Sequence, residues 1–187
     1  MICIINFGSS KTEKIGTCLQ ALGYSFQIYK WDELEHVDWK AVTGIILSGA
    51  PVLLTETDNR IYIDEFEFLL TSSIPVLGIC FGHQLLGLLF GARVFKGDEI
   101  RTETEISICF KDHLFDGFDE KAKMMEDHTE GINFPDSFIK LASSEKYENE
   151  AMKHSSLNIF GVQFHPEVSG ENGLKLLSNF CKLTTQK

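Results

Sequence analysis

Short, uninterrupted apolar runs that alternate with amphipathic stretches are the feature that most constrains the fold of this chain. The runs predict strands at residues 2–7, 26–29, 42–47, 74–79 and 159–164. Apolar residues at helical spacing between them predict helices. Strands that are apolar throughout are typical of a parallel sheet covered by helices on both faces, because neither face meets water. The pattern therefore predicts an α/β fold with three layers and a central, mostly parallel sheet.

Residues 94–142 depart from this pattern. Apolar and polar residues alternate there, as in the series Ile106, Ile108 and Phe110. Such alternation predicts strands with one exposed face, and hence a small antiparallel edge. The chain contains no internal repeat and no linker rich in proline and glycine, so we expect a single domain over residues 1–187.

Charge and cysteine content exclude several classes of function. With 17 Lys and Arg against 27 Asp and Glu, the net charge is −10. Nucleic acids and anionic membranes require clustered Lys and Arg, so neither is an expected partner. No apolar run reaches the roughly 18 residues of a membrane span. The five cysteines form no C-x-x-C pair, so neither a disulfide framework nor a metal site is expected. These features predict a cytoplasmic protein.

The segment Gly78-Ile79-Cys80-Phe81-Gly82 carries the strongest functional signal. It is a G-x-C-x-G form of the nucleophile elbow, a tight turn between a strand and a helix. Neighbours without side chains let the chain pass close to a strained residue. The helix N-terminus also favours a thiolate over a thiol. The alternative is that Cys80 is a small buried apolar residue, and the pattern alone leaves both interpretations open.

A thiolate nucleophile needs a base, and the base needs a group that orients it. The last predicted strand ends in His165-Pro166-Glu167. In an extended chain, residues two apart point the same way at roughly 6 to 7 Å, so the Glu167 carboxylate can hold the His165 ring. His83 is a rival base, but a helix N-terminus disfavours its protonation. We therefore predict His165 as the base; a surface turn is the alternative interpretation of this segment.

Acyl chemistry also needs donors for the developing oxyanion. The backbone NH of Phe81, directly after the nucleophile, is one candidate. The turn Ser48-Gly49-Ala50-Pro51 follows another predicted parallel strand and can supply the second donor. Alone, this turn would be interpreted as the end of a strand.

Taken together, residues 78–84 and 161–167 resemble the two motifs of the class I (triad) glutamine amidotransferases. The resemblance covers nearly the whole chain and implies a flavodoxin-like α/β glutaminase domain. It implies that Cys80 attacks the side-chain amide of L-glutamine, that His165 is the general acid and base, and that Glu167 orients His165. Ammonia would leave first, and water would then cleave the γ-glutamyl thioester to give glutamate.

The same resemblance assigns the remaining site residues. It implies that the backbone of Gly49, Ala50 and Phe81 forms the oxyanion hole. It also implies that Gln84 and the segment containing His128 and Thr129 line the glutamine pocket.

Within the family, residues 45–51 and 161–168 are most similar to the free-standing glutaminase subunits of two-subunit GMP synthetases. This similarity implies a separate synthetase of the ATP-pyrophosphatase type that aminates XMP. The chain has no glycine-rich phosphate loop, so we expect no cofactor on it, and ATP and Mg²⁺ only on the partner. The charge of −10 suggests a basic docking face on that partner.

The chain departs from this subgroup in three segments: Ala50 replaces a glycine, Asp127-His128-Thr129-Glu130 replaces an S-H-x-D stretch with Glu130 in place of the aspartate, and Ser169-Gly170 replaces a His-Thr pair. Alanine at position 50 would cost about 1 kcal/mol if that position needed a positive φ. The alternatives are a glutaminase subunit of another synthetase, such as anthranilate synthase, and a Cys-dependent γ-glutamyl or peptide hydrolase of the same fold. A non-catalytic relative ranks last, because it would be expected to have lost a triad residue.

Overall fold

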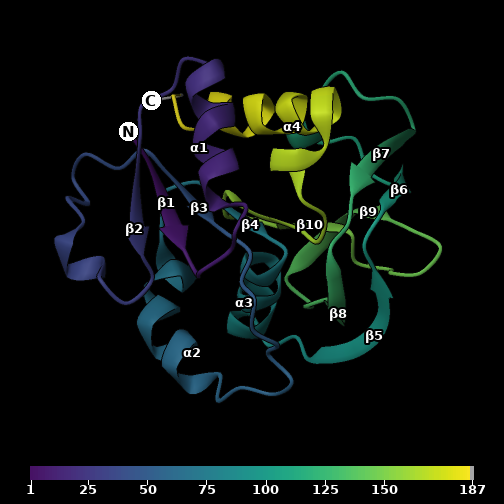
Figure 1. Cartoon of the computed structure of the whole chain (residues 1–187), viewed down its shortest axis with the longest axis horizontal. Coiled ribbons are helices and arrows are strands. Elements are labelled where there is room, and N and C mark those ends of the chain that lie inside the picture. The colour runs from purple at the N-terminus through teal and green to yellow at the C-terminus, as the bar shows by residue number, and fades with distance from the viewer. Residues whose placement is uncertain (186–187) are drawn as a thin grey trace.

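A nine-stranded sheet forms the centre of the computed structural model, which describes residues 1–185 (Figure 1). Its strand order is β2-β1-β3-β4-β11-β10-β9-β6-β7. The parallel part consists of β2 (Phe26–Lys30), β1 (Ile2–Asn6), β3 (Gly44–Leu47), β4 (Val76–Ile79) and β11 (Ile159–Val162). The antiparallel part consists of β10 (Ala151–His154), β9 (Phe138–Ser143), β6 (Glu103–Ile108) and β7 (Lys121–Met125). A second, antiparallel sheet pairs β5 (Val94–Ile100) with β8 (His128–Ile132).

Helices cover both faces of the parallel part. Figure 1 shows α1 (Thr12–Ala21) and α4 (Gly170–Leu183) on one side of the sheet, with α2 (Arg60–Phe66) and α3 (Phe81–Leu89) on the other. Short 3₁₀ helices occupy Leu34–His36, Glu67–Thr71, His113–Phe115 and Pro166–Val168. None of the helices within residues 1–185 is both long and apolar enough to cross a bilayer.

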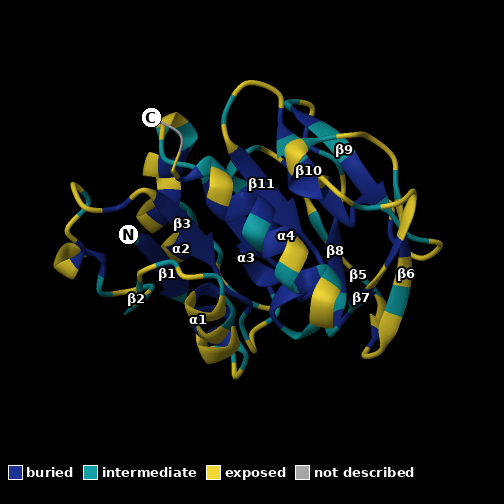
Figure 2. Ribbon diagram, turned by 90° about the horizontal axis from the view of Figure 1, so that it is seen from above, coloured by how far each residue is buried: buried dark blue, intermediate teal, exposed yellow. Residues whose placement is uncertain are grey.

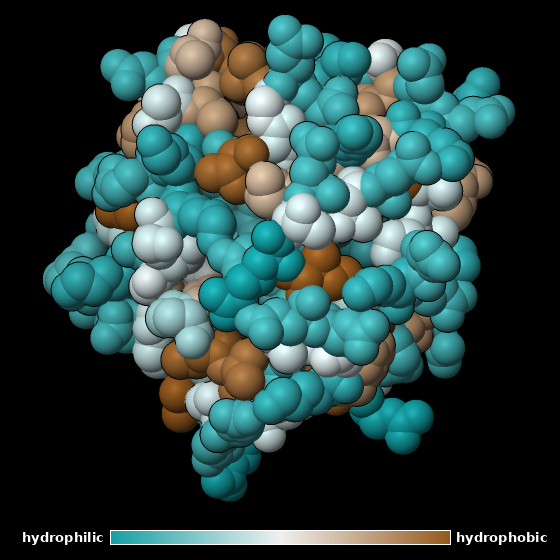
Figure 3. Space-filling model, turned by 45° about the vertical axis from the view of Figure 1, so that its right-hand side comes forward, coloured by the Kyte–Doolittle hydropathy of each residue, from teal (hydrophilic) through white to brown (hydrophobic). Residues whose placement is uncertain are grey.

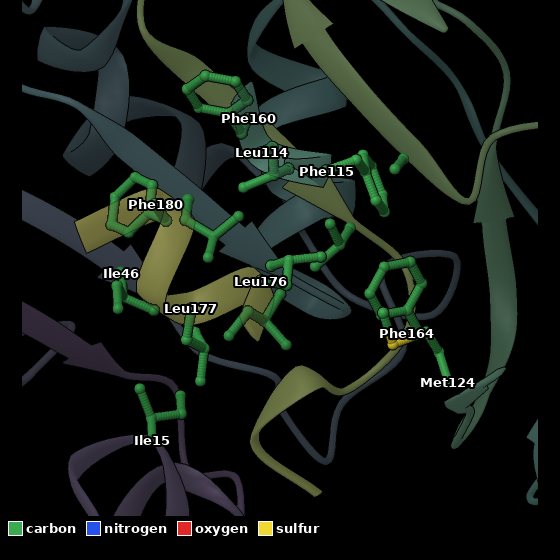
Figure 4. Packing of buried hydrophobic residues seen from close by; sticks show 14 of the residues in the cluster. Ile15, Ile46, Leu114, Phe115, Met124, Phe160, Phe164, Leu176, Leu177 and Phe180 are labelled. Atoms are coloured by element: carbon green, nitrogen blue, oxygen red, sulfur yellow. The ribbon is translucent and has the colours of Figure 1, made fainter. Parts of the chain in front are cut away.

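The core is divided by the sheet into two apolar clusters. In the cluster of Figure 4, Leu176, Leu177 and Phe180 of α4 pack with Ile46 of β3 and Phe160 of β11. All five side chains are at most 1% exposed, and burying one such side chain contributes about 1.5–3 kcal/mol. Figure 2 shows the same layering, with buried strands between helices whose outer surfaces are exposed.

The α/β prediction is confirmed, including the helices on both faces. Strands β1, β3, β4 and β11 are buried over almost their whole length, as their apolar runs require. Strand β6 has the alternating exposure that its sequence predicts. The antiparallel part of the central sheet is four strands wide, with β10 beside β11 and β7 at the far edge. The end of β7 still reaches the segment after β11, because the NH of His165 donates to the carbonyl of Met125 at 2.8 Å.

Candidate active site

Cys80 lies on the turn that joins strand β4 to helix α3. Its φ of 51° and ψ of −103° make it the only non-glycine residue with a positive φ among residues 1–185. Such a conformation costs on the order of 1–3 kcal/mol and persists only where the surroundings hold it. Here the NH of Cys80 donates to the carbonyl of Val162 at 2.8 Å, and the NH of Gly82 donates to the carbonyl of Ser48 at 3.1 Å. The turn therefore has the geometry of a nucleophile elbow.

The two glycines of the elbow are required by close backbone approaches. A Cβ on Gly78 would lie 2.5 Å from the carbonyl group of Gly82, and a Cβ on Gly82 would lie 2.5 Å from the carbonyl oxygen of Leu47. Real Cβ atoms essentially never come so close to backbone atoms. The steric reason that the sequence suggested for the G-x-C-x-G pattern is therefore confirmed.

His165 and Glu167 meet directly after strand β11. Nδ1 of His165 lies 2.7 Å from Oε1 of Glu167, and the two residues are 2% and 6% exposed. The predicted contact is confirmed, but the predicted extended geometry is wrong. Pro166 begins a 3₁₀ turn that contains Glu167, so the carboxylate reaches the ring across that turn.

Cys80 and His165 adjoin at Gly49. A Cβ on Gly49 would lie 3.1 Å from Cε1 of His165 and 3.8 Å from Cβ of Cys80. Burial lowers the pKa of His165, but hydrogen bonding to Cys80 and Glu167 and their negative charges outweigh burial and raise it to about 10. The imidazole therefore retains its proton at neutral pH, which leaves a proton donor beside the sulfur of Cys80.

The rival base, His83, is poorly placed for proton transfer. It is 0% exposed and does not line the cavity that contains Cys80. Its Nδ1 would be 2.5 Å from a Cβ on Gly161, so the ring packs against strand β11. Burial, with a smaller contribution from His128, lowers the pKa of His83 to about 3. His83 is therefore a neutral residue of the interior, and the geometry favours His165.

Two backbone NH groups beside Cys80 are free to donate. Within residues 1–185, neither the NH of Ala50 nor that of Phe81 makes a hydrogen bond. The hydroxyl of Ser48 fixes the turn before Ala50, since it accepts from the NH of Phe7 at 3.0 Å and donates to the carbonyl of Gly49 at 2.8 Å. Ala50 has no positive φ, so the cost considered for alanine at this position does not arise.

A cavity of about 310 Å³ opens above the elbow. The predicted residues that line it are Ala50, Cys80, Phe81, Gln84, His128, Thr129 and His165. Gly49 and Glu167 do not line the cavity, but both contact His165, which does. Gly49 lies beside the ring of His165, and the carboxylate of Glu167 orients that ring. The structure therefore brings every predicted site residue to one place.

Charged residues that the sequence did not indicate also line the cavity. Nζ of Lys11 lies 2.5 Å from Oδ2 of Asp127, and Nε of Arg101 lies 3.7 Å from its Oδ1. Burial raises the pKa of Asp127, but its hydrogen bond and ion pair with Lys11 outweigh this and lower it. Charges of both signs at one cavity suit an amino acid, which carries an ammonium and a carboxylate group.

Glu130 of strand β8 connects the loop that contains Leu54 and Thr55 with helix α3 through hydrogen bonds. Its carboxylate accepts hydrogen bonds from the NH of Leu54 at 2.8 Å, the NH of Thr55 at 2.8 Å and the hydroxyl of Thr55 at 2.5 Å. Its backbone carbonyl accepts from Nε2 of Gln84 at 2.9 Å and lies 2.9 Å from Nδ1 of His128. The sequence marked Glu130 only as a substitution for aspartate, and it held no signal for this role.

Comparison with known proteins identifies the family of this chain. The family model of glutamine amidotransferase class-I matches residues 3–183. The chain is 36% identical to a subunit of glutamine-hydrolysing GMP synthase from Pyrococcus abyssi over 187 residues, which cover 98% of each chain. It is 35% identical to the protein of the same name from Methanocaldococcus jannaschii, with 100% of this chain and 99% of that protein covered.

Solved structures show the same fold. A protein from Thermoplasma acidophilum, proposed to be a subunit of GMP synthase, superposes with a TM-score of 0.88 at 28% identity, over 98% of this chain and 92% of the other. A glutamine amidotransferase from Thermotoga maritima gives a TM-score of 0.85 at 19% identity, over 99% and 98% of the two chains, a likeness of fold alone. With its family model, its full-length relatives and its fold in agreement, the chain belongs to the class I glutamine amidotransferases.

Proposed function

We propose that this chain is the glutamine-hydrolysing subunit of a GMP synthase and forms one glutaminase domain over residues 1–187. It releases ammonia from L-glutamine for a separate synthetase, of the ATP-pyrophosphatase type, that aminates XMP to GMP. The observation that carries this proposal is the match, over 98% of both chains, to a relative named as a subunit of glutamine-hydrolysing GMP synthase. The chain itself needs no cofactor for this chemistry, and ATP and Mg²⁺ act on the partner.

In the first half of the reaction, the Cys80 thiolate attacks the side-chain amide carbon of glutamine. The carbonyl oxygen gains negative charge, and the free NH groups of Ala50 and Phe81 stabilise it. His165, which keeps its proton at neutral pH, donates that proton to the departing nitrogen. Ammonia leaves, and a γ-glutamyl thioester remains on Cys80.

In the second half, water cleaves the thioester. His165, now neutral, takes a proton from the attacking water and keeps it, the sulfur leaves as a thiolate, and the new carboxylic acid loses its proton to solvent. Glu167 keeps Nδ1 protonated and the ring oriented through both steps. Glutamate is released, and the thiolate and imidazolium are restored.

The ammonia must reach the partner before it takes up a proton, because ammonium is not a nucleophile. The two chains therefore dock closely. The face in Figure 3 is largely hydrophilic, with apolar side chains in separate patches. Together with the charge of −10 this supports docking onto a basic surface, and added salt should slow association.

The test is to assay the purified chain with L-glutamine, first by itself and then with the synthetase, ATP and XMP. We expect glutamate release that rises when the synthetase is added, and GMP in equal amount. Glutamate with chorismate as the only productive acceptor would indicate an anthranilate synthase component. Activity on γ-glutamyl peptides but not on glutamine would indicate a hydrolase and overturn the proposal.

Exchanging Glu167 for glutamine should lower kcat for glutamine hydrolysis by about 10²-fold or more, because the ring of His165 loses its orienting carboxylate. The carboxylate charge raises the pKa of His165, so its removal lowers that pKa. His165 must be protonated to release ammonia. As pH rises, the variant should therefore lose activity at a lower pH than the wild type does. A pH profile of kcat/KM checks this, and an unmoved alkaline limb would contradict it. Glu171→Gln, exposed on the first turn of α4, is the control.

Exchanging Glu130 for glutamine should raise KM for glutamine about tenfold. The amide retains one acceptor oxygen for the donors of Leu54 and Thr55 and loses the charge that strengthens those bonds. The loop that lines the cavity would then be held less firmly. Glu56→Gln is the matched control, since Glu56 lies in the same loop and forms only an exposed ion pair with Lys96. Equal KM values for the two variants would remove the role assigned to Glu130.

A further inference from the structure

Behind the glutamine cavity, two carboxyl groups and one imidazole converge in the protein interior. Glu126 precedes strand β8, His128 begins it, and Glu150 precedes strand β10. Glu126 and Glu150 are 0% exposed, and His128 is 7% exposed. One oxygen of each glutamate and one ring nitrogen of His128 all lie within 4.8 Å of one another. Glutamine hydrolysis uses neither carboxyl group.

These groups lack hydrogen-bond partners although they are buried. Among the residues that the structure describes, both carboxyl oxygens of Glu126, both of Glu150 and Nε2 of His128 are unpartnered while the two glutamates are ionised. A proton on one glutamate would let the two carboxyl groups bond to each other, and Ser144 is the one hydroxyl beside Glu150. Buried polar atoms are nearly always satisfied by protein, water or an ion, so such a concentration requires an explanation. Every one of these atoms can offer a lone pair.

The orientation of His128 indicates what is missing. Its Nδ1 lies 2.9 Å from the carbonyl oxygen of Glu130, which can only accept, so the ring proton is on Nδ1. The bare Nε2 then faces Oε2 of Glu126 at 3.0 Å without the geometry of a hydrogen bond. Two lone pairs at this separation repel unless a positive charge lies between them. A histidine that donates one NH to a backbone carbonyl and presents the other nitrogen is typical of metal ligands.

We propose that Glu126, His128 and Glu150 bind one divalent transition-metal ion of the Zn²⁺ class. Imidazole nitrogen with carboxylate oxygen suits Zn²⁺, whereas Mg²⁺ and Ca²⁺ prefer oxygen ligands alone. Ligand bonds of about 2.0–2.2 Å require the carboxyl groups to turn inward by about an ångström. The two carboxylates neutralise the charge of the ion, so the buried site carries no net charge.

The ion would have a positioning role. Asp127, His128 and Thr129 line the cavity. Because Glu126 and His128 flank Asp127, and Glu150 directly precedes strand β10, an ion bound by all three ligands would hold this segment against the start of β10. No metal was expected from the sequence, because the ligands come from separate segments and follow no recognised spacing.

Protons are the competing occupants. Burial raises the pKa of Glu126 to about 7, and burial with the charge of Glu126 raises that of Glu150 to about 8. Without an ion the pair would therefore hold protons near neutral pH, and the experiment must separate the two cases.

The test uses the full chain, stripped with EDTA and dialysed, then titrated with ZnCl₂ by calorimetry and followed by thermal unfolding. We expect one Zn²⁺ per chain, and a rise in Tm of about 5–10 °C at a hundredfold excess over Kd. MgCl₂ should produce neither effect. Glu126→Gln and Glu150→Gln should each bind Zn²⁺ at least tenfold more weakly, with the rise in Tm lost.

Glu148→Gln is the matched control, because its carboxylate is exposed and pairs only with Lys140. It should bind Zn²⁺ as the wild type does. Glutamine copies the shape of a protonated glutamate, so unchanged Tm values of the metal-free variants would show that they fold. If the wild type bound no Zn²⁺, the proposal would be overturned and the cluster would hold protons. If all variants bound Zn²⁺ equally, the proposal would be overturned and the ion would be bound by surface groups. Glutamine hydrolysis by the wild-type chain, assayed separately, tests the proposed function whatever the outcome of the Zn²⁺ titration.

Discussion

Replacing Cys80 with alanine is expected to lower glutamine hydrolysis by a factor of at least about 10⁴, the scale seen when a covalent nucleophile is removed. Without the sulfur no γ-glutamyl thioester can form, and the remaining groups only bind glutamine and stabilise charge. The fold should persist, because the Cβ that the elbow accommodates is retained and only one atom is lost. Release of glutamate, measured over hours with purified variant, checks the loss.

Cys109→Ala is the control for this experiment, since Cys109 is an exposed cysteine outside the cavity. This variant should hydrolyse glutamine at the wild-type rate. A second control tests the proposed partnership. With ammonium salts in place of glutamine, the complex containing Cys80→Ala should still aminate XMP, because ammonia reaches the synthetase directly. If Cys80→Ala kept more than about 1% of glutaminase activity, the nucleophile would be another group and the elbow would have a different role.

The fold could be predicted well where burial alone determines the sequence. Strands β1, β3, β4 and β11 meet helices on both sides, so their apolar runs are continuous and easily recognised. The order of strands could not be predicted, because it depends on pairings between distant segments. Strand β11 pairs with β4, and Val162 lies opposite Ile79. This single pairing places the residues after both strands together, and so brings His165 to Cys80.

The candidate site divides in the same way. Residues within the two motifs, such as Cys80, His165 and Glu167, could be predicted because chemistry restricts residue type and order there. Arg101 and Glu130 could not, because the turn after β5 and strand β8 bring them to the cavity, and no local pattern marks a residue that holds a distant loop. The buried carboxyl groups of Glu126 and Glu150 were missed for the same reason. Glutamate is usually exposed, and only the structure shows that these two are not.

Replacing Gly173 with alanine should give the second large effect, although this residue lies on helix α4 and outside the cavity wall. A Cβ there would be 1.8 Å from the carbonyl oxygen of Pro166, the residue between His165 and Glu167. The helix or the catalytic turn must therefore move by more than an ångström. We expect the free energy of unfolding to fall by about 3 kcal/mol. We also expect kcat to fall by about 10²-fold, because small displacements of catalytic groups are costly.

Urea denaturation and kcat at saturating glutamine measure the two effects, and Ser178→Ala on the same helix is the control. Ser178 is half-buried, and its replacement should change the free energy of unfolding by less than about 0.5 kcal/mol. Helix propensity favours alanine over glycine by about 1 kcal/mol, so it opposes the predicted loss. A stabilised Gly173→Ala variant with full activity would mean that helix α4 can move away from Pro166 without cost. The close approach of α4 would then have no part in holding His165 and Glu167 against Cys80.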